Sequence, residues 1–307
     1  TSITEDQFGN IWFASSGYGL FTTNSKKNVF TNLLTGSDAL EGLRTTVVTS
    51  FYEDARRRIW VGTAGSGVVL YDPAKTERPL MPTPLFGSLA VNDVKGDNAG
   101  HIWVATWADG LKEYNPATRS IRSYLHDPLD SNSLINNDVN TILPDDSVIW
   151  IGTHGEGVAV LHPQNGKFVH YKNNHEYPFN MQEPAWVNHL FKDSKKRIWI
   201  STYSGLFMYN GKTLRHYEHN DTPASINSNS VNMVAEDRQG RLWVVTEQGL
   251  DRFDEQQQAF IHLNKQLRLP ESMKSIICDA NNILWVSAND GLISLDPVTL
   301  KTSLYVK

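Results

Sequence analysis

Three features of the sequence predict an all-β fold. A tryptophan-centred motif recurs seven times along the 307 residues, and short apolar runs rich in β-branched and aromatic residues lie between turn residues. No stretch shows helical periodicity of useful length. A unit that repeats every 40 to 50 residues or so is typical of a repeat architecture. The repeat period is therefore a better guide to the number of domains than the chain length is.

Seven of the nine tryptophans share one local pattern, in which Ile or Leu precedes the indole and Phe, Val or Ile follows it. Their separations are 48, 43, 47, 49, 44 and 42 residues. The motif tryptophans are Trp12, Trp60, Trp103, Trp150, Trp199, Trp243 and Trp285. This regular register predicts seven equivalent structural units.

An aspartate and a glycine accompany each motif tryptophan. The aspartate lies six residues upstream in six units, at Asp6, Asp54, Asp97, Asp193, Asp237 and Asp279, and five upstream in the fourth unit, at Asp145. The glycine lies six or seven residues downstream, at Gly19, Gly67, Gly110, Gly157, Gly205, Gly249 and Gly291. Aspartate can accept hydrogen bonds from backbone amides two residues on, and glycine tolerates positive φ, so both residues indicate tight turns between strands.

The sixth unit shows the expected strands most clearly. Apolar runs at 231–235, 242–246, 250–253 and 259–263 are separated by turn residues. Four antiparallel strands in 42 to 49 residues is the size of a propeller blade. The sequence therefore predicts a single seven-bladed β-propeller over residues 1–307. The first unit begins at its innermost strand and the last ends at its outermost one, so the ring is expected to close without a strand exchanged between the termini.

Composition and charge exclude several classes of protein. The net charge of -5 argues against a general nucleic-acid binder, which needs a basic face. Cys278 is the only cysteine, so no intrachain disulfide or cysteine-based metal site can form, and its apolar surroundings favour a buried thiol. No apolar run reaches the roughly 18 residues of a membrane span, and the chain starts on a strand pattern, as a mature or excised piece would.

The full motif is Asp-x-x-Gly-x-Ile-Trp, then Val, Ile or Phe, then a small residue and Thr, and two residues later Gly-Leu. It stands most completely at 97–106 and again at 59–63. It resembles the two-component regulator propeller repeat, over essentially the whole chain. The resemblance implies the periplasmic sensor region of a Bacteroides-type hybrid two-component system. It further implies detection of oligosaccharides from polysaccharide breakdown, with the signal carried through a homodimer. The implied partners in the full-length chain are a second propeller, a β-sandwich domain and a histidine kinase.

Recurrence within the chain separates structural residues from functional candidates. A residue present in every unit serves the unit, so the motif aspartates and tryptophans are interpreted as structural. The asparagines of the innermost strands are expected to satisfy backbone groups; they are Asn92, Asn140, Asn188 and Asn232. A residue that breaks the pattern on an exposed turn is free to contact a ligand.

The turn after the second strand breaks the pattern. Four residues past each motif tryptophan lie Ser16, Ala64, Trp107, His154, Tyr203, Glu247 and Asn289. We expect these turns to share one end of the propeller with the loops that lead into the next blade. Trp107 and Tyr203 suit stacking on a sugar ring, while His154, Glu247 and Asn289 suit hydrogen bonds to hydroxyls. A long loop from Asn173 to Ala185 adds His175, Glu176, Tyr177 and Phe179 and ends at Trp186, the sixth candidate.

Basic residues gather in the turns after the first strand, at Arg56–Arg58, Lys195–Arg197 and Arg238–Arg241. Solvated turn tips beside acidic neighbours explain them, and docking of an acidic partner domain is the alternative.

The rival function is enzymatic, because propellers of similar repeat include streptogramin-type and polysaccharide lyases. A lyase needs a base near the channel mouth, and His154, Glu156 and Glu247 form only a weak acid–base set. No motif supports a metal site, a cofactor site or a catalytic residue. A third possibility is a spacer and dimerisation platform without its own ligand.

Overall fold

The computed structural model describes residues 2–15, 19–24, 30–32, 47–72, 74, 80–82, 86–174, 185–270, 272–289 and 291–306. The chain divides into two compact units. Unit 1 contains residues 1–154 and 158–174, and unit 2 contains residues 155–157 and 175–307. The predicted residues Ser16, His175, Glu176, Tyr177 and Phe179 lie outside the described part of the chain.

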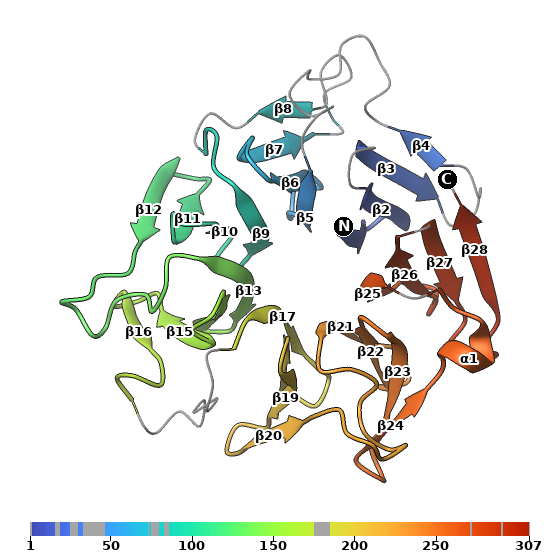
Figure 1. The fold of residues 1–307 in the computed structure, drawn as a ribbon. Coiled ribbons are helices and arrows are strands. Elements are labelled where there is room, and N and C mark those ends of the chain that lie inside the picture. The colour runs from blue at the N-terminus through green and yellow to red at the C-terminus, as the bar shows by residue number, and fades with distance from the viewer. Residues whose placement is uncertain are drawn as a thin grey trace. The chain divides into compact units, whose positions relative to one another are not determined.

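Unit 1 contains four antiparallel sheets of four strands each, and each sheet is built from consecutive strands. Their strands are β1 (Ile3–Glu5), β2 (Asn10–Ser15), β3 (Gly19–Asn24), β4 (Phe30–Asn32); β5 (Val48–Glu53), β6 (Ile59–Thr63), β7 (Val68–Tyr71), β8 (Leu80–Pro82); β9 (Val91–Gly96), β10 (Ile102–Thr106), β11 (Leu111–Asn115), β12 (Ser120–Tyr124); and β13 (Val139–Asp145), β14 (Val148–Thr153), β15 (Val158–His162), β16 (Lys167–Val169). The innermost strands β1, β5, β9 and β13 contact one another in chain order (Figure 1).

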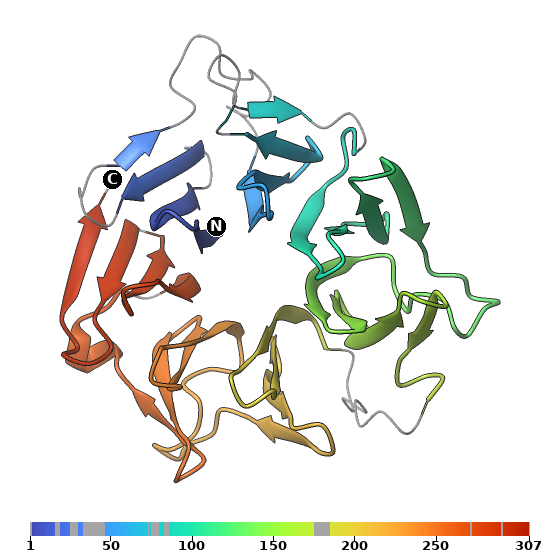
Figure 2. The ribbon, with the colours of Figure 1, turned by 180° about the vertical axis from the view of Figure 1, so that it is seen from behind.

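Unit 2 contains three further sheets of the same kind and one helical turn. Its elements are β17 (Val187–Lys192), β18 (Ile198–Thr202), β19 (Gly205–Tyr209), β20 (Leu214–Tyr217); β21 (Val231–Glu236), β22 (Leu242–Thr246), β23 (Gly249–Asp254), β24 (Ala259–His262); the turn α1 (Asn264–Leu267); and β25 (Met273–Cys278), β26 (Leu284–Ala288), β27 (Gly291–Leu295), β28 (Thr302–Val306). The innermost strand β17 contacts β21, and β21 contacts β25, while β20, β24 and β28 are the outermost strands (Figure 2).

Seven four-stranded antiparallel blades confirm the predicted all-β fold, a seven-bladed β-propeller. In the sixth blade, every strand boundary falls within a residue of the expected one. The first sheet is β1 to β4 and the last is β25 to β28, so neither borrows a strand from the other terminus, as expected. That residues 1–307 form one domain stays a prediction.

The motif aspartate holds its tryptophan and its own turn together. In six blades the indole Nε1 donates to Oδ2 of the aspartate at 2.8–2.9 Å, in the pairs Trp12–Asp6, Trp60–Asp54, Trp103–Asp97, Trp199–Asp193, Trp243–Asp237 and Trp285–Asp279. The other oxygen accepts from the turn, as when Asp6 Oδ1 accepts from the N–H groups of Phe8 and Asn10 at 2.9 Å. The aspartates are therefore structural, as the recurrence indicated.

The fourth blade departs from this arrangement because it lacks one residue. Asp145 pairs with Val148 across a two-residue turn, in which Asp146 has a φ of 45°. Positive φ at a turn position is tolerated by aspartate more readily than by most residues, so the shortened hairpin keeps the strand register.

The buried tryptophans pack blade against blade. Trp12 lies in a cluster with Phe51 and Ile59 of the second blade, and Trp243 lies in one with Ile276 and Leu284 of the seventh. Trp60, Trp103 and Trp199 likewise lie in clusters with hydrophobic residues of the following blade. A four-stranded sheet alone would leave its apolar faces in water. These contacts bury the apolar face of one blade against the next blade.

Asparagines of the innermost strands link neighbouring blades. The side-chain N–H of Asn92 donates to the carbonyl of Val139 at 2.8 Å, that of Asn188 to Val231 at 2.8 Å, and that of Asn232 to Met273 at 2.7 Å. Each acceptor is the first residue of the next innermost strand. These three asparagines satisfy backbone groups, as predicted.

Candidate functional site

The turn after the second strand lies beside the start of the innermost strand of the same blade. The N–H of Trp107 donates to the carbonyl of Ala90 at 2.9 Å, that of His154 to Asp138 at 2.9 Å, and that of Glu247 to Ser230 at 3.0 Å. Because each acceptor directly precedes or closely adjoins an innermost strand, these turns and the loops leading into the blades share one end of each blade. We call it the loop end.

Trp107 and His154 form the first pair of candidates, in unit 1. Their ring centroids are 4.8 Å apart at an interplanar angle of 62°, and Trp107 is 47% exposed. The turn of Trp107 is held by Asp138, whose Oδ1 accepts from the N–H of Ala108 at 2.8 Å. Burial lowers the pKa of His154, and the nearby carboxylate of Asp138 partly opposes the shift. The pair therefore offers an open indole face beside an imidazole that is neutral at pH 7.

Trp186 and Tyr203 form the second pair, in unit 2. Trp186 is 46% exposed and Tyr203 48% exposed, with ring centroids 5.7 Å apart at 70°. Gly155 lies against the indole: a Cβ added there would be 3.4 Å from Trp186 Nε1. Large, rigid aromatic side chains give contact area at a small cost in conformational entropy, so an exposed pair of this kind suits stacking on a flat ligand.

Glu247 and Asn289 are exposed and belong to neither pair. Glu247 lines a cavity of about 720 Å³ at the loop end of the sixth blade. The six predicted residues thus lie as two aromatic pairs, one acid at a cavity and one exposed asparagine. Their role as ligand contacts stays a prediction.

Two connecting loops at the loop end have the same internal hydrogen bonds. His126 Nδ1 bonds the carbonyl of Leu134, and His219 Nδ1 that of Ile226, both at 2.7 Å. In each loop an asparagine, Asn137 or Asn229, accepts from the N–H of the histidine. The tryptophan register does not reveal this second repeat. Its signal in the sequence is a histidine followed, six or seven residues later, by Ser-Leu or Ser-Ile.

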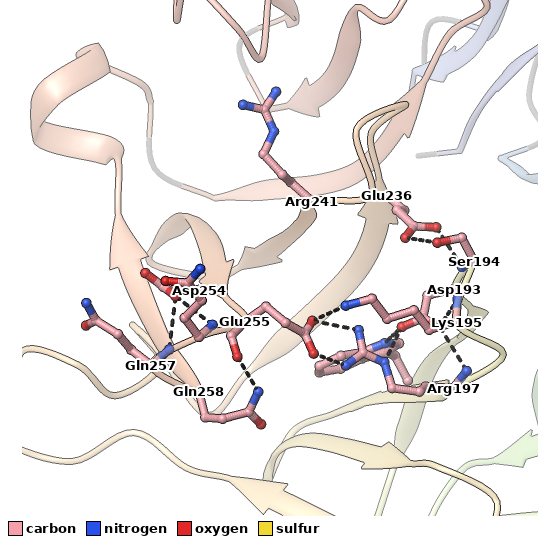
Figure 3. A network of polar contacts seen from close by, with 12 residues as sticks. Asp193, Ser194, Lys195, Arg197, Glu236, Arg241, Asp254, Glu255, Gln257 and Gln258 are labelled. Atoms are coloured by element: carbon pink, nitrogen blue, oxygen red, sulfur yellow. Dashed lines mark hydrogen bonds and ion pairs between the residues drawn. The ribbon is translucent and has the colours of Figure 1, made fainter.

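Basic turns lie at the other end of the blades, and their arginines are paired. Arg58, Arg197 and Arg241 each bond their own motif aspartate at 2.6 Å. Arg197 also donates two hydrogen bonds, of 2.6 and 2.9 Å, to Glu255 of the next blade (Figure 3). The three arginines therefore lie beside acidic neighbours, as expected, but Arg197 is buried and not a solvated turn tip.

In the part of the chain that the structure describes, no group of three or more His, Cys, Asp and Glu side chains could hold a metal ion. Within the same residues, no helix has the length and apolar character needed to cross a membrane.

The model of the family described as "Two component regulator propeller" matches residues 42–65 and 225–248. Histidine kinase P4 of Formosa agariphila is 32% identical over 267 residues, which are 82% of this chain and 19% of that kinase. The chain therefore spans about a fifth of the length of this relative.

Solved structures share the fold. The extracellular domain of a hybrid two component system, BT3049, from B. thetaiotaomicron superposes with a TM-score of 0.57 at 18% identity, over 99% of this chain and 45% of that one. Virginiamycin B lyase from Staphylococcus aureus superposes with a TM-score of 0.65 at 12% identity, over 93% of this chain and 90% of that one. At these identities the likeness concerns the fold, while the repeat model concerns the family. The chain is therefore a seven-bladed β-propeller in which residues 42–65 and 225–248 match the two-component regulator propeller repeat.

Proposed function

We propose that this chain is the ligand-sensing propeller of a hybrid two-component sensor, and that it responds to oligosaccharides from polysaccharide breakdown. The observation that carries the proposal is the pair of exposed aromatic clusters at the loop end, Trp107 with His154 and Trp186 with Tyr203. Single exposed aromatics are ordinary on protein surfaces, but an exposed indole beside a second ring and hydrogen-bonding groups suits stacking on the apolar face of a sugar.

The output of the sensor lies outside this chain. The relative with 32% identity is a histidine kinase, and the chain covers 19% of it. We infer a periplasmic position, since the similar structure of BT3049 is an extracellular domain. A second propeller and a β-sandwich domain in the same protein, and a homodimer of the intact receptor, complete the proposed path from ligand to kinase.

Calorimetry of the 307-residue chain with defined oligosaccharides tests this function. We expect binding without turnover, weakened at least tenfold by Trp107→Ala or Tyr203→Ala. Phe8→Ala is the matched control, because Phe8 is an exposed aromatic of the turn between β1 and β2, at the other end of its blade. Unchanged binding in both aromatic variants contradicts the assignment of these residues.

Product analysis on the same mixtures distinguishes the sensor from an enzyme. The likeness to virginiamycin B lyase makes a lyase the alternative to exclude. Cleavage products that disappear with His154→Ala would contradict the sensor. If no saccharide binds, and Trp107→Ala leaves the response of the full-length receptor intact, the propeller is a spacer and dimerisation platform.

A further inference from the structure

The sixth blade carries a carboxylate where the other blades carry none. Asp251 is the second residue after the glycine that opens the third strand. The equivalent residues of the other blades are Phe21, Val69, Lys112, Ala159, Phe207 and Ile293. Asp251 is fully buried, at 0% exposure. A residue that breaks a sevenfold pattern in the interior does not serve the blade as such, and burying a carboxylate is costly unless partners compensate.

Two hydrogen bonds hold this carboxylate. His262 Nδ1 lies 2.8 Å from Oδ1, and the N–H of Asn227 donates to Oδ2 at 2.8 Å. Asp251 and His262 face each other across β23 and β24. Burial raises the pKa of Asp251, while His262 and Asn227 oppose the shift. The carboxylate fixes the imidazole with Nδ1 toward the interior, and Nε2 has no hydrogen-bond partner among the residues that the structure describes.

The fourth blade provides an internal comparison. Phe168 and Phe260 occupy the same place, since each donates its N–H to the preceding loop at 2.9 Å, to Asn132 and Ala224 respectively. Two residues further on lie His170 and His262. His170 is buried, and the third strand of its blade has Ala159 at the position equivalent to Asp251. The side chain of His262 is 36% exposed. The fourth and sixth blades therefore share the histidine. The buried aspartate and the accessible imidazole ring occur together only in the sixth of these two blades.

His262 lines the cavity of about 720 Å³, together with Glu247, Lys265, Asn227, Asn264 and Gln248. The walls are fixed, because the side-chain N–H groups of Asn227 and Asn264 both donate to the carbonyl of Gln248, at 3.0 and 3.1 Å. Leu269 supplies an apolar surface. This volume lies within the range of about 300–1,000 Å³ of small-molecule sites.

The chemistry of the lining indicates the kind of ligand. Glu247 and Lys265 give one negative and one positive charge, and the other polar groups are amides and an imidazole. Such a lining offers both donors and acceptors without a net charge. It favours a ligand with many hydroxyl groups over one with several sulfates or carboxylates, which needs a cluster of cations.

We propose that the cavity bounded by His262, Glu247 and Lys265 is a binding site for a neutral saccharide unit, with His262 oriented by Asp251 as the central hydrogen-bonding group. This inference rests on the proposed sensing function and gives it a position and a ligand class. It places the central contact in the sixth blade and on a residue outside the two aromatic pairs.

Calorimetry of the 307-residue chain with cellobiose, laminaribiose and maltose tests the site, with digalacturonic acid as the charged comparison. We expect at least one neutral disaccharide to bind, His262→Gln to weaken it at least tenfold, and Lys265→Ala to weaken it about threefold. His170→Gln is the matched control and should leave the affinity unchanged. Lys265 lies on the single turn α1 and is not buried, so its replacement tests the site even if His262→Gln or Asp251→Ala impairs folding.

The outcomes separate the site from the function. If a disaccharide binds and neither His262→Gln nor Lys265→Ala changes its affinity, while Trp107→Ala or Tyr203→Ala does, the cavity is excluded and the sensing function stands. Binding of digalacturonic acid alone overturns the neutral ligand class. Failure of every saccharide to bind overturns both proposals for this chain.

Discussion

The indole N–H of Trp199 donates a hydrogen bond of 2.8 Å to Oδ2 of Asp193, and both side chains are buried. The same carboxylate accepts from the N–H groups of Lys195 and Arg197 through Oδ1 and from the guanidinium of Arg197 through Oδ2 (Figure 3). One side chain thus satisfies the tryptophan, the turn and an arginine that reaches the next blade.

Replacement of this aspartate should destabilise the chain severely. Asp193→Ala leaves a buried indole N–H and turn amides without their acceptor, which should cost about 3 kcal/mol of the free energy of unfolding. Asp254→Ala is the control, because Asp254 also accepts from two turn amides, those of Gln256 and Gln257, but on an exposed turn. Its cost should be about 0.5 kcal/mol. Equal losses for the two variants in urea denaturation would refute the central role of the motif aspartate.

The link between Arg197 and Glu255 should make stability depend on pH. Hydrogen bonds from Arg197 lower the pKa of Glu255, so its contribution is present above the ordinary glutamate pKa and is lost as pH falls through the folded value. Glu255→Gln should therefore lower the melting temperature at pH 7, and the difference from wild type should shrink at acid pH. Asp109→Asn, on an exposed turn, should show no such convergence. A difference that is constant from pH 7 to pH 3.5 would contradict the linkage.

His154 should titrate below the ordinary histidine range. Burial lowers its pKa and Asp138 opposes this, so Asp138→Asn should lower the pKa further. Since the folded pKa is depressed, the stability tied to neutral His154 is present above the unfolded pKa of about 6.5 and is lost as pH falls through the folded value. NMR titration of the imidazole in both proteins measures the shift directly. A rise in the pKa of His154 on Asp138→Asn would show that another group governs it.

Cys278 should react slowly with alkylating reagents. The thiol is half-buried, and not fully buried as the sequence indicated. This partial burial and the adjacent Asp279 raise the pKa of the thiol to about 11. Relative to the ordinary value of 9.0, the thiolate fraction at pH 7.5 falls about 100-fold. Iodoacetamide labelling of the folded chain, with the urea-unfolded chain as control, should show a comparable retardation. Similar rates in the two states would mean that the thiol is accessible and ionises normally.

The fold could be predicted because the features that define a blade recur in the sequence. Strands of the sixth blade were placed to within a residue, since the run of apolar residues and the turn chemistry at Asp237 and Gly249 act locally. The alternating direction of the strands alone predicts which end of the blade carries Trp107, His154, Tyr203 and Glu247. It does not predict which of these side chains contact each other. Trp107 and His154 are 47 residues apart and meet only because two blades pack together.

Asp251 breaks the sevenfold pattern inside a strand and not in a turn, where variation is expected. At its position the other blades have hydrophobic residues or a lysine, so a comparison of equivalent strand positions identifies it from the sequence. Its pairing with His262, eleven residues later, also requires the register of β23 and β24, which a two-residue period alone does not fix.

The asparagine links between blades have a consequence for how such a chain can change over time. Asn92, Asn188 and Asn232 all donate to a main-chain carbonyl of the following blade. A carbonyl is present whatever residue occupies that position, so the link imposes no side-chain identity on its neighbour. Blades can therefore be duplicated, exchanged or diverge at their turns without a compensating substitution at this joint, and one repeat can supply propellers with different loop surfaces.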